Sequence, residues 1–115
     1  MEREKVSLVV IWTSRDREVA LNMVLMYTHN AKRKGWWDDV RLIVWGPSSK
    51  LLCEDEELQN KIEEMKRDGV ILEACKACAD NYGVSKSLEE LGINVYYIGE
   101  KLTQYIKEGR KIITF

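Results

Sequence analysis

The stretch Gly69-Val70-Ile71-Leu72-Glu73-Ala74-Cys75-Lys76-Ala77-Cys78-Ala79-Asp80-Asn81-Tyr82-Gly83 joins a short apolar run to two cysteines in CxxC spacing. The β-branched run predicts a strand over 69–75, and the residues after it predict a short helix over 76–81. Cys75 would therefore lie where a strand ends and a helix begins. Unpaired N–H groups and the helix dipole favour thiolate there, so we expect the pKa of Cys75 to be lowered, with help from Lys76.

The same alternation of strand and helix extends along the whole chain of 115 residues. Strands are expected at 6–12, 40–45, 69–75, 93–98 and 111–115, and helices at 17–34, 50–53, 54–67, 76–81, 86–91 and 99–107. Regular alternation is typical of a parallel sheet covered by helices on both faces, joined by right-handed crossovers. The predicted fold is an α/β protein, a three-layer α/β/α sandwich with a mainly parallel five-stranded sheet, in a single domain over 1–115.

A parallel sheet gathers the carboxyl ends of its strands at one edge, where open α/β folds bind their ligands. The residues expected at this edge are Trp12, Trp45, Cys75 and Gly99, with Lys76 next to Cys75. We therefore predict that Trp12, Trp45, Lys76 and Gly99 form a pocket around the thiol, and that the indoles shield it from water.

Bulk composition narrows the function classes. The formal net charge of −1 and the absence of a basic run argue against nucleic-acid binding, and no apolar run is long enough to span a bilayer. The start of the chain lacks the features of a signal peptide, so we expect a cytoplasmic protein with reduced cysteines. The adjacent indoles of Trp36 and Trp37 favour a contact between subunits.

Other chemistries of a CxxC pair are weighed against thiolate chemistry. Zinc would need Cys75, Cys78, Cys53 and a fourth ligand such as His29 or Asp80, and only one CxxC pair is present. Thioredoxin-type exchange remains open, although the chain lacks the usual aromatic before the motif and the later cis-proline. No nucleotide-binding glycine motif occurs, and no metal or other cofactor is expected.

Several segments in this order resemble the DsrE/DsrF-like sulfur-relay family, which includes the TusD-type sulfur carriers. These segments are Val9-Val10-Ile11-Trp12, Val44-Trp45-Gly46-Pro47-Ser48, Leu51-Leu52, Gly69 to Cys75, Leu91-Gly92-Ile93-Asn94-Val95, and Gly109 to Phe115. The resemblance implies a homotrimer or hexamer of small α/β/α domains. It also implies that Cys75 carries sulfur as a persulfide between donor and acceptor proteins.

The functional hypothesis from sequence is therefore a sulfur carrier that acts through Cys75, with the question of a true sulfurtransferase enzyme left open. Cys78 has two open roles, because it could resolve the persulfide to a disulfide or act as a second acceptor. The location of Cys53 relative to this site is also open. The alternative from another class is a non-enzymatic oligomeric module that binds a small ligand or a peptide.

Overall fold

A computed structural model describes residues 5–115 of the chain. Its elements are β1 (Ser7–Trp12), α1 (Arg17–Val19), η1 (Ala20–Val24), α2 (Leu25–Arg33), β2 (Asp39–Val44), α3 (Pro47–Glu54), α4 (Glu56–Arg67), β3 (Ile71–Cys75), α5 (Lys76–Tyr82), α6 (Ser85–Glu90), β4 (Asn94–Tyr96), α7 (Ile98–Lys107) and β5 (Lys111–Thr114). Every strand predicted from the sequence is present, and the predicted alternation with helices is confirmed.

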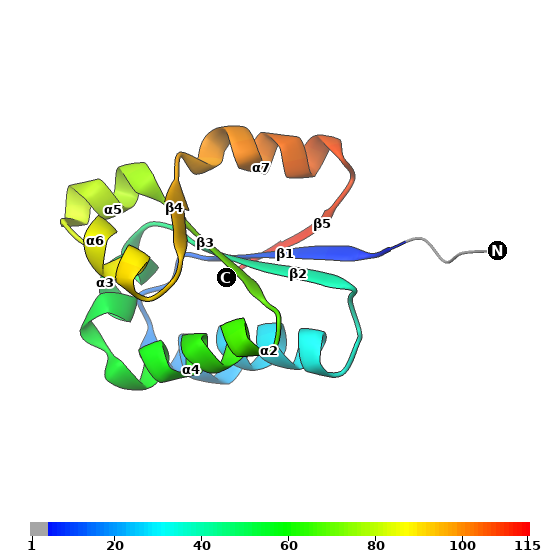
Figure 1. The fold of residues 1–115 in the computed structure, drawn as a ribbon, viewed down its shortest axis with the longest axis horizontal. Helices are drawn as coiled ribbons and strands as arrows, with labels where there is room; N and C mark the ends of the chain where they lie inside the picture. Colours follow the sequence, from blue (N-terminus) through cyan, green and yellow to red (C-terminus); the bar gives the residue numbers. More distant parts are fainter. Residues whose placement is uncertain (1–4) are drawn as a thin grey trace.

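The five strands form one sheet in the order β4-β3-β2-β1-β5, and all neighbouring strands are parallel. Helices α2 and α4 lie on one side of the sheet and α7 lies on the other (Figure 1). The shorter helices α3, α5 and α6 gather at the end of the sheet where β1 and β3 finish. The predicted α/β/α sandwich with a parallel sheet is therefore confirmed.

Alternating side chains of the central strands build two separate cores. Leu8, Val10 and Trp12 of β1 belong to the larger core on the α2 and α4 side. Val9 and Ile11 belong to the smaller core on the α7 side. Because successive strand residues point to opposite faces, a shift of one position moves a side chain from one core to the other.

The first helical region differs from one regular helix over 17–34. Asp16 accepts hydrogen bonds from the N–H groups of Glu18 and Val19 and so begins α1. The next turn, η1, is a π-helical segment that widens the helix before α2. The predicted short helix at 50–53 is also longer, because α3 begins at Pro47, a residue favoured in the first helical turn.

The fourth strand is shorter than predicted. β4 ends at Tyr96, and Ile98 begins α7 instead of ending the strand, so Gly99 is the second residue of that helix. The Ile98 side chain is buried in the core on the α7 side, which holds the start of the helix against the sheet.

The paired indoles after α2 have different environments. The Trp36 side chain is 53% exposed. The Trp37 ring packs against the larger core and donates a hydrogen bond to the Tyr27 hydroxyl at 3.1 Å. Only Trp36 therefore retains the exposure that a contact between subunits requires.

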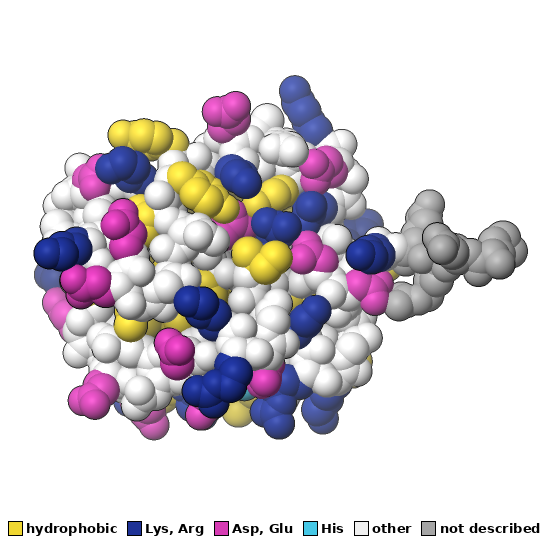
Figure 2. Space-filling model, viewed as in Figure 1, with side chains coloured by type: hydrophobic (Ala, Val, Ile, Leu, Met, Phe, Trp, Pro, Cys, Tyr) yellow, Lys and Arg dark blue, Asp and Glu magenta, His cyan; other side chains and the backbone are white. Residues whose placement is uncertain are grey.

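The face shown in Figure 2 carries charges of both signs without a continuous patch of either, and hydrophobic side chains also reach it. The exposed hydrophobic residues of the chain include Tyr82 of α5, Tyr97 at the start of α7 and Ile106 of α7. Within residues 5–115, no helix has the length and apolarity needed to cross a membrane.

Candidate functional site

Cys75 is the last residue of β3 and the N-cap of α5. Its side chain lies in the smaller core, on the side of the sheet covered by α7, and only 5% of the residue is exposed. The buried residues of that core are Val9, Ile11, Ile43, Cys75, Ile98 and Tyr105. The thiol therefore sits at the predicted strand-to-helix junction, beneath the surface.

Aromatic side chains flank Cys75 on both neighbouring strands. Tyr96 of β4 pairs directly with Cys75, and Val44 of β2 pairs with Ala74, so Trp45 follows at the position level with Cys75. Tyr96 and Trp45 both pack against the core that contains the thiol. Trp45 was expected near the site. Tyr96 was missed, because only the register of β4 against β3 shows it.

The pKa of the Cys75 thiol is raised above its ordinary value, chiefly because burial disfavours the charged thiolate. The backbone N–H groups of Cys78 and Ala77 hydrogen-bond the sulfur and act in the opposite direction, as expected at a helix start. The lowered pKa predicted from the sequence is therefore wrong. The predicted amide donors are present, but their effect is smaller than that of burial.

Lys76 does not supply the predicted positive charge to the thiol. Its Nζ atom forms an ion pair with Asp80 at 2.8 Å and lies 5.7 Å from the centre of the Tyr97 ring. Gly99 is exposed in the first turn of α7. Lys76 and Gly99 therefore border the region around Cys75 at the surface without contributing to its ionisation.

Trp12 does not share a pocket with Cys75. It is fully buried in the larger core on the opposite side of the sheet, and its indole N–H donates to the Ser14 carbonyl at 3.0 Å. Trp12 pairs with Val44, whereas Cys75 is level with Trp45, one residue further along the sheet. The sequence-based prediction assumed that both indoles lie beside Cys75 because both lie at predicted strand ends. An offset of one residue places the Trp12 side chain on the other face of the sheet.

The three cysteines do not gather into one site. Cys78 packs against the core that contains Cys75, whereas Cys53 packs against the opposite core. His29, a proposed fourth zinc ligand, hydrogen-bonds Asp68 at 2.6 Å. Across residues 5–115, no group of three or more histidine, cysteine and acidic side chains could hold a metal ion, so the zinc set considered from the sequence is not assembled.

A shallow depression adjoins the thiol-containing core. It has a volume of about 420 Å³ and is lined by Ile11, Thr13, Trp45, Gly46, Pro47 and Thr114. Ile11 and Trp45 also belong to the core around Cys75. The depression lies where β1, β2 and β5 end, so the structure has an open apolar surface at the predicted edge of the sheet.

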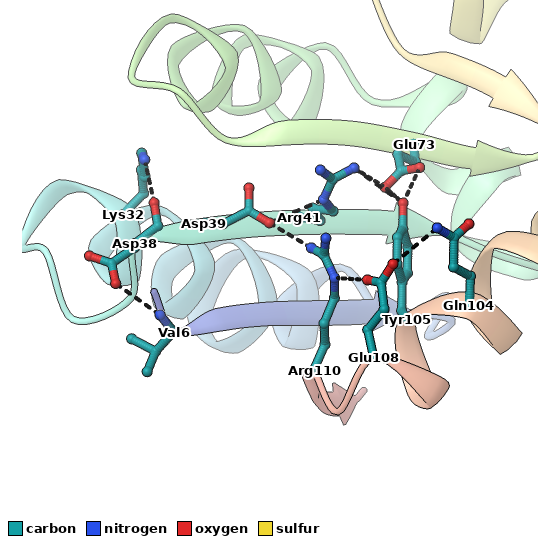
Figure 3. A network of polar contacts seen from close by, with 10 residues as sticks. All are labelled: Val6, Lys32, Asp38, Asp39, Arg41, Glu73, Gln104, Tyr105, Glu108 and Arg110. Carbon is teal, nitrogen blue, oxygen red and sulfur yellow. Dashed lines mark hydrogen bonds and ion pairs between the residues drawn. The ribbon is translucent and has the colours of Figure 1, made fainter. Parts of the chain in front are cut away.

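A buried polar network on the same side of the sheet was not predicted from the sequence (Figure 3). Glu73 is fully buried two residues before Cys75, and the Tyr105 hydroxyl donates to its carboxylate oxygens at 2.8 and 2.9 Å. Arg41 Nη1 lies 3.2 Å from the Tyr105 hydroxyl and 3.5 Å from Glu73 Oε1. The network therefore ties β2 and β3 to α7.

Burial and the hydrogen bond to Glu73 raise the pKa of Tyr105 to about 12, so the phenol stays a donor at neutral pH. Arg110 extends the network to Asp39 at 2.7 Å and to Glu108 at 2.8 Å. The position of Glu73 within an otherwise apolar strand was the one available signal, because a charged residue inside a buried strand requires a partner.

Comparison with known proteins places the whole chain in one family. A protein of unknown function from Bacteroides thetaiotaomicron is 40% identical, with a TM-score of 0.91, and the match covers 95% of this chain and 94% of that protein. The ychN protein from E. coli is 18% identical, with a TM-score of 0.74 over 97% of this chain and 100% of its own.

A protein of unknown function from Methanobacterium thermoautotrophicum is 20% identical, with a TM-score of 0.72 over 97% of this chain and 100% of its own. These two more distant structures share the fold. No curated protein matches the sequence. Residues 6–115 match the DsrE/DsrF-like family, and the chain therefore belongs to it.

Proposed function

We propose that this protein is a sulfur carrier that receives sulfane sulfur from a donor protein on Cys75 and delivers it to an acceptor protein. Family membership and the position of Cys75 support the proposal. The observation that carries it is the position of Cys75 as the N-cap of α5, where the N–H groups of Ala77 and Cys78 act to lower the pKa of the thiol against the effect of burial. These donors stabilise the thiolate during the transfer step.

The proposed step is a thiol exchange. The Cys75 thiolate attacks the terminal sulfur of a donor persulfide, the donor S–S bond breaks, and the donor leaves as a thiolate. The proton stays on the transferred sulfur, so Cys75 becomes Cys75–S–SH without net oxidation. Burial between Tyr96 and Trp45 limits access of water and oxidants to this persulfide.

Uptake of sulfur by the reduced protein tests the proposal. The protein is incubated with glutathione persulfide, quenched with iodoacetamide, and analysed by intact and peptide mass spectrometry. When the quench follows mixing immediately, we expect one added sulfur on the peptide that contains Cys75. Cys75→Ser should lose this gain, because Cys75 is the thiol that ends β3 and begins α5.

Two matched variants complete this experiment. Cys53→Ser and Cys78→Ser should each still take up one sulfur at Cys75, since Cys53 lies in the opposite core and Cys75 remains intact in both. The proposal fails if Cys78→Ser takes up no sulfur, or if Cys75→Ser gains as much sulfur as the variants that retain Cys75.

We also propose that the chain forms a homotrimer or hexamer through an apolar surface beside β5. Met23, Met26, Trp36 and Ile113 are each more than 40% exposed and line one depression of about 350 Å³. Single exposed apolar residues are ordinary, but a group of large ones around one depression is typical of a protein contact.

Light scattering tests this association. The wild-type protein should give a mass that is a multiple of 13.4 kDa, and Met26→Glu should lower it because the carboxylate would be buried in the contact. Tyr82→Glu, a change at another exposed hydrophobic residue, on α5, should leave the mass unaltered. A monomeric wild-type protein would contradict the proposal.

A further inference from the structure

The two cysteines at the start of α5 lie at the same core. Cys75 is the N-cap of the helix and is buried in that core, and Cys78 is the third residue of the helix and packs against it. Residues three positions apart in an α-helix are separated by about 4.5 Å along the axis, which is compatible with the Cα spacing of a disulfide. The spacing of the pair therefore permits a Cys75–Cys78 disulfide.

The two thiols differ in exposure. Cys75 is buried at 5% exposure, whereas Cys78 is only half-buried and packs at the border of the same core. Cys78 is therefore the thiol that solvent bases reach first. Because Cys78 follows Cys75 by three residues at the start of α5 and packs against the same core, Sγ is the atom of a Cys75 persulfide that its sulfur is placed to attack.

We propose that Cys78 is a resolving thiol that releases the sulfur carried on Cys75 as hydrosulfide and leaves a Cys75–Cys78 disulfide. This inference rests on the proposed function, since it requires a persulfide on Cys75. It gives the protein a second outcome beside delivery to an acceptor protein, namely reduction of sulfane sulfur to sulfide.

The step balances in atoms and electrons. The Cys78 thiolate attacks Cys75 Sγ, the Sγ–SH bond breaks, and its electron pair leaves with the terminal sulfur as HS⁻. The Cys78 sulfur is oxidised from the thiolate to the disulfide level, the oxidation level of Cys75 Sγ is unchanged, and the terminal sulfane sulfur is reduced to sulfide. Hydrosulfide is a weaker base than a cysteine thiolate, so it is the better leaving group.

The disulfide product sets a requirement for the next cycle. Cys75 cannot accept sulfur again until a dithiol reductant attacks the pair and restores both thiols. The half-buried Cys78 sulfur is the accessible end of this disulfide. Hydrosulfide release is thereby coupled to the supply of a dithiol.

The test compares wild type, Cys78→Ser, Cys78→Ala and Cys53→Ser after loading with glutathione persulfide and rapid removal of the donor. Released hydrosulfide is trapped with monobromobimane, and intact mass is measured without reductant. We expect wild type and Cys53→Ser to release one equivalent of hydrosulfide and to form the disulfide. Both Cys78 variants should keep the added sulfur and release none.

Each result separates this inference from the proposed function. If the Cys78 variants take up sulfur but lose it as hydrosulfide as fast as wild type, the resolving role is overturned while the carrier role stands. Retention of sulfur by wild type, or its migration to Cys78, overturns the resolving role in the same way. If no variant that retains Cys75 takes up sulfur, the carrier role itself fails.

Discussion

Tyr105→Phe should lower the free energy of unfolding by about 3 kcal/mol, because it removes the only hydroxyl that donates to the buried carboxylate among the described contacts of Glu73. Glu73 is fully buried, and the remaining contact with Arg41, at 3.5 Å, is too long to compensate alone. Equilibrium urea unfolding of the two proteins, followed by tryptophan fluorescence, measures the difference.

A double-mutant cycle separates the hydrogen bond from the loss of packing. In the Glu73→Gln background the buried side chain is a neutral amide, so Tyr105→Phe should lower the free energy of unfolding by less than it does in wild type. We expect a coupling energy between the two positions above about 1 kcal/mol. Tyr82→Phe, on an exposed residue of α5, should change stability by less than about 0.5 kcal/mol. Additive effects of the Glu73 and Tyr105 changes would show that the contact contributes nothing specific.

The network has a consequence for the site. Tyr105 holds α7 against β3, and Ile98 at the start of α7 packs in the same core as Cys75. The packing of α7 over Cys75 therefore depends on the hydrogen bond between Tyr105 and Glu73 on the same face of the sheet. Loss of this hydrogen bond should loosen α7 and expose Cys75.

The fold was predictable because local patterns along the chain agreed with one architecture. Apolar β-branched runs such as 6–12 and 40–45 alternate with amphipathic segments such as 54–67, and helix-length connections force parallel pairing. The exception is the end of β4, where Ile98 has strand-like character but packs as the first residue of α7. Tertiary burial decides such a boundary.

The site was predictable only as far as the strand-to-helix junction. Which indole lies beside Cys75 depends on register, and Trp12 and Trp45 differ by a single position in the sheet. The contact between Glu73 and Tyr105 joins residues 32 positions apart. Neither register nor such long-range contacts are readable from local sequence patterns.

The ionisation of Cys75 was predicted with the wrong sign for a related reason. The helix N–H groups and the helix dipole lower the pKa of the thiol, and both are local features that can be recognised in the sequence. Burial raises the pKa, and it arises from the packing of α7 on the sheet. At Cys75 the effect of burial on the pKa is the larger of the two.

The alkylation rate of Cys75 by iodoacetamide should rise about tenfold per pH unit from about pH 7 to pH 9 without a plateau, because the raised pKa keeps the resting thiol protonated. Peptide mass spectrometry resolves this rate from those of Cys53 and Cys78. The chain unfolded in urea is the matched control, since its Cys75 has an ordinary pKa. At neutral pH native Cys75 should react at least about tenfold more slowly than in that control.

The free energy of unfolding should also depend on pH, because folding raises the pKa of Cys75. A pKa raised by folding means that the protonated thiol stabilises the native state below the ordinary cysteine pKa, and this contribution is lost as pH rises through the native value. A plateau in the alkylation rate below about pH 8 would instead show a thiolate stabilised by α5. A protonated resting thiol resists oxidation between loading events, so a carrier of this kind would gain reactivity only when a donor opens the core around Cys75.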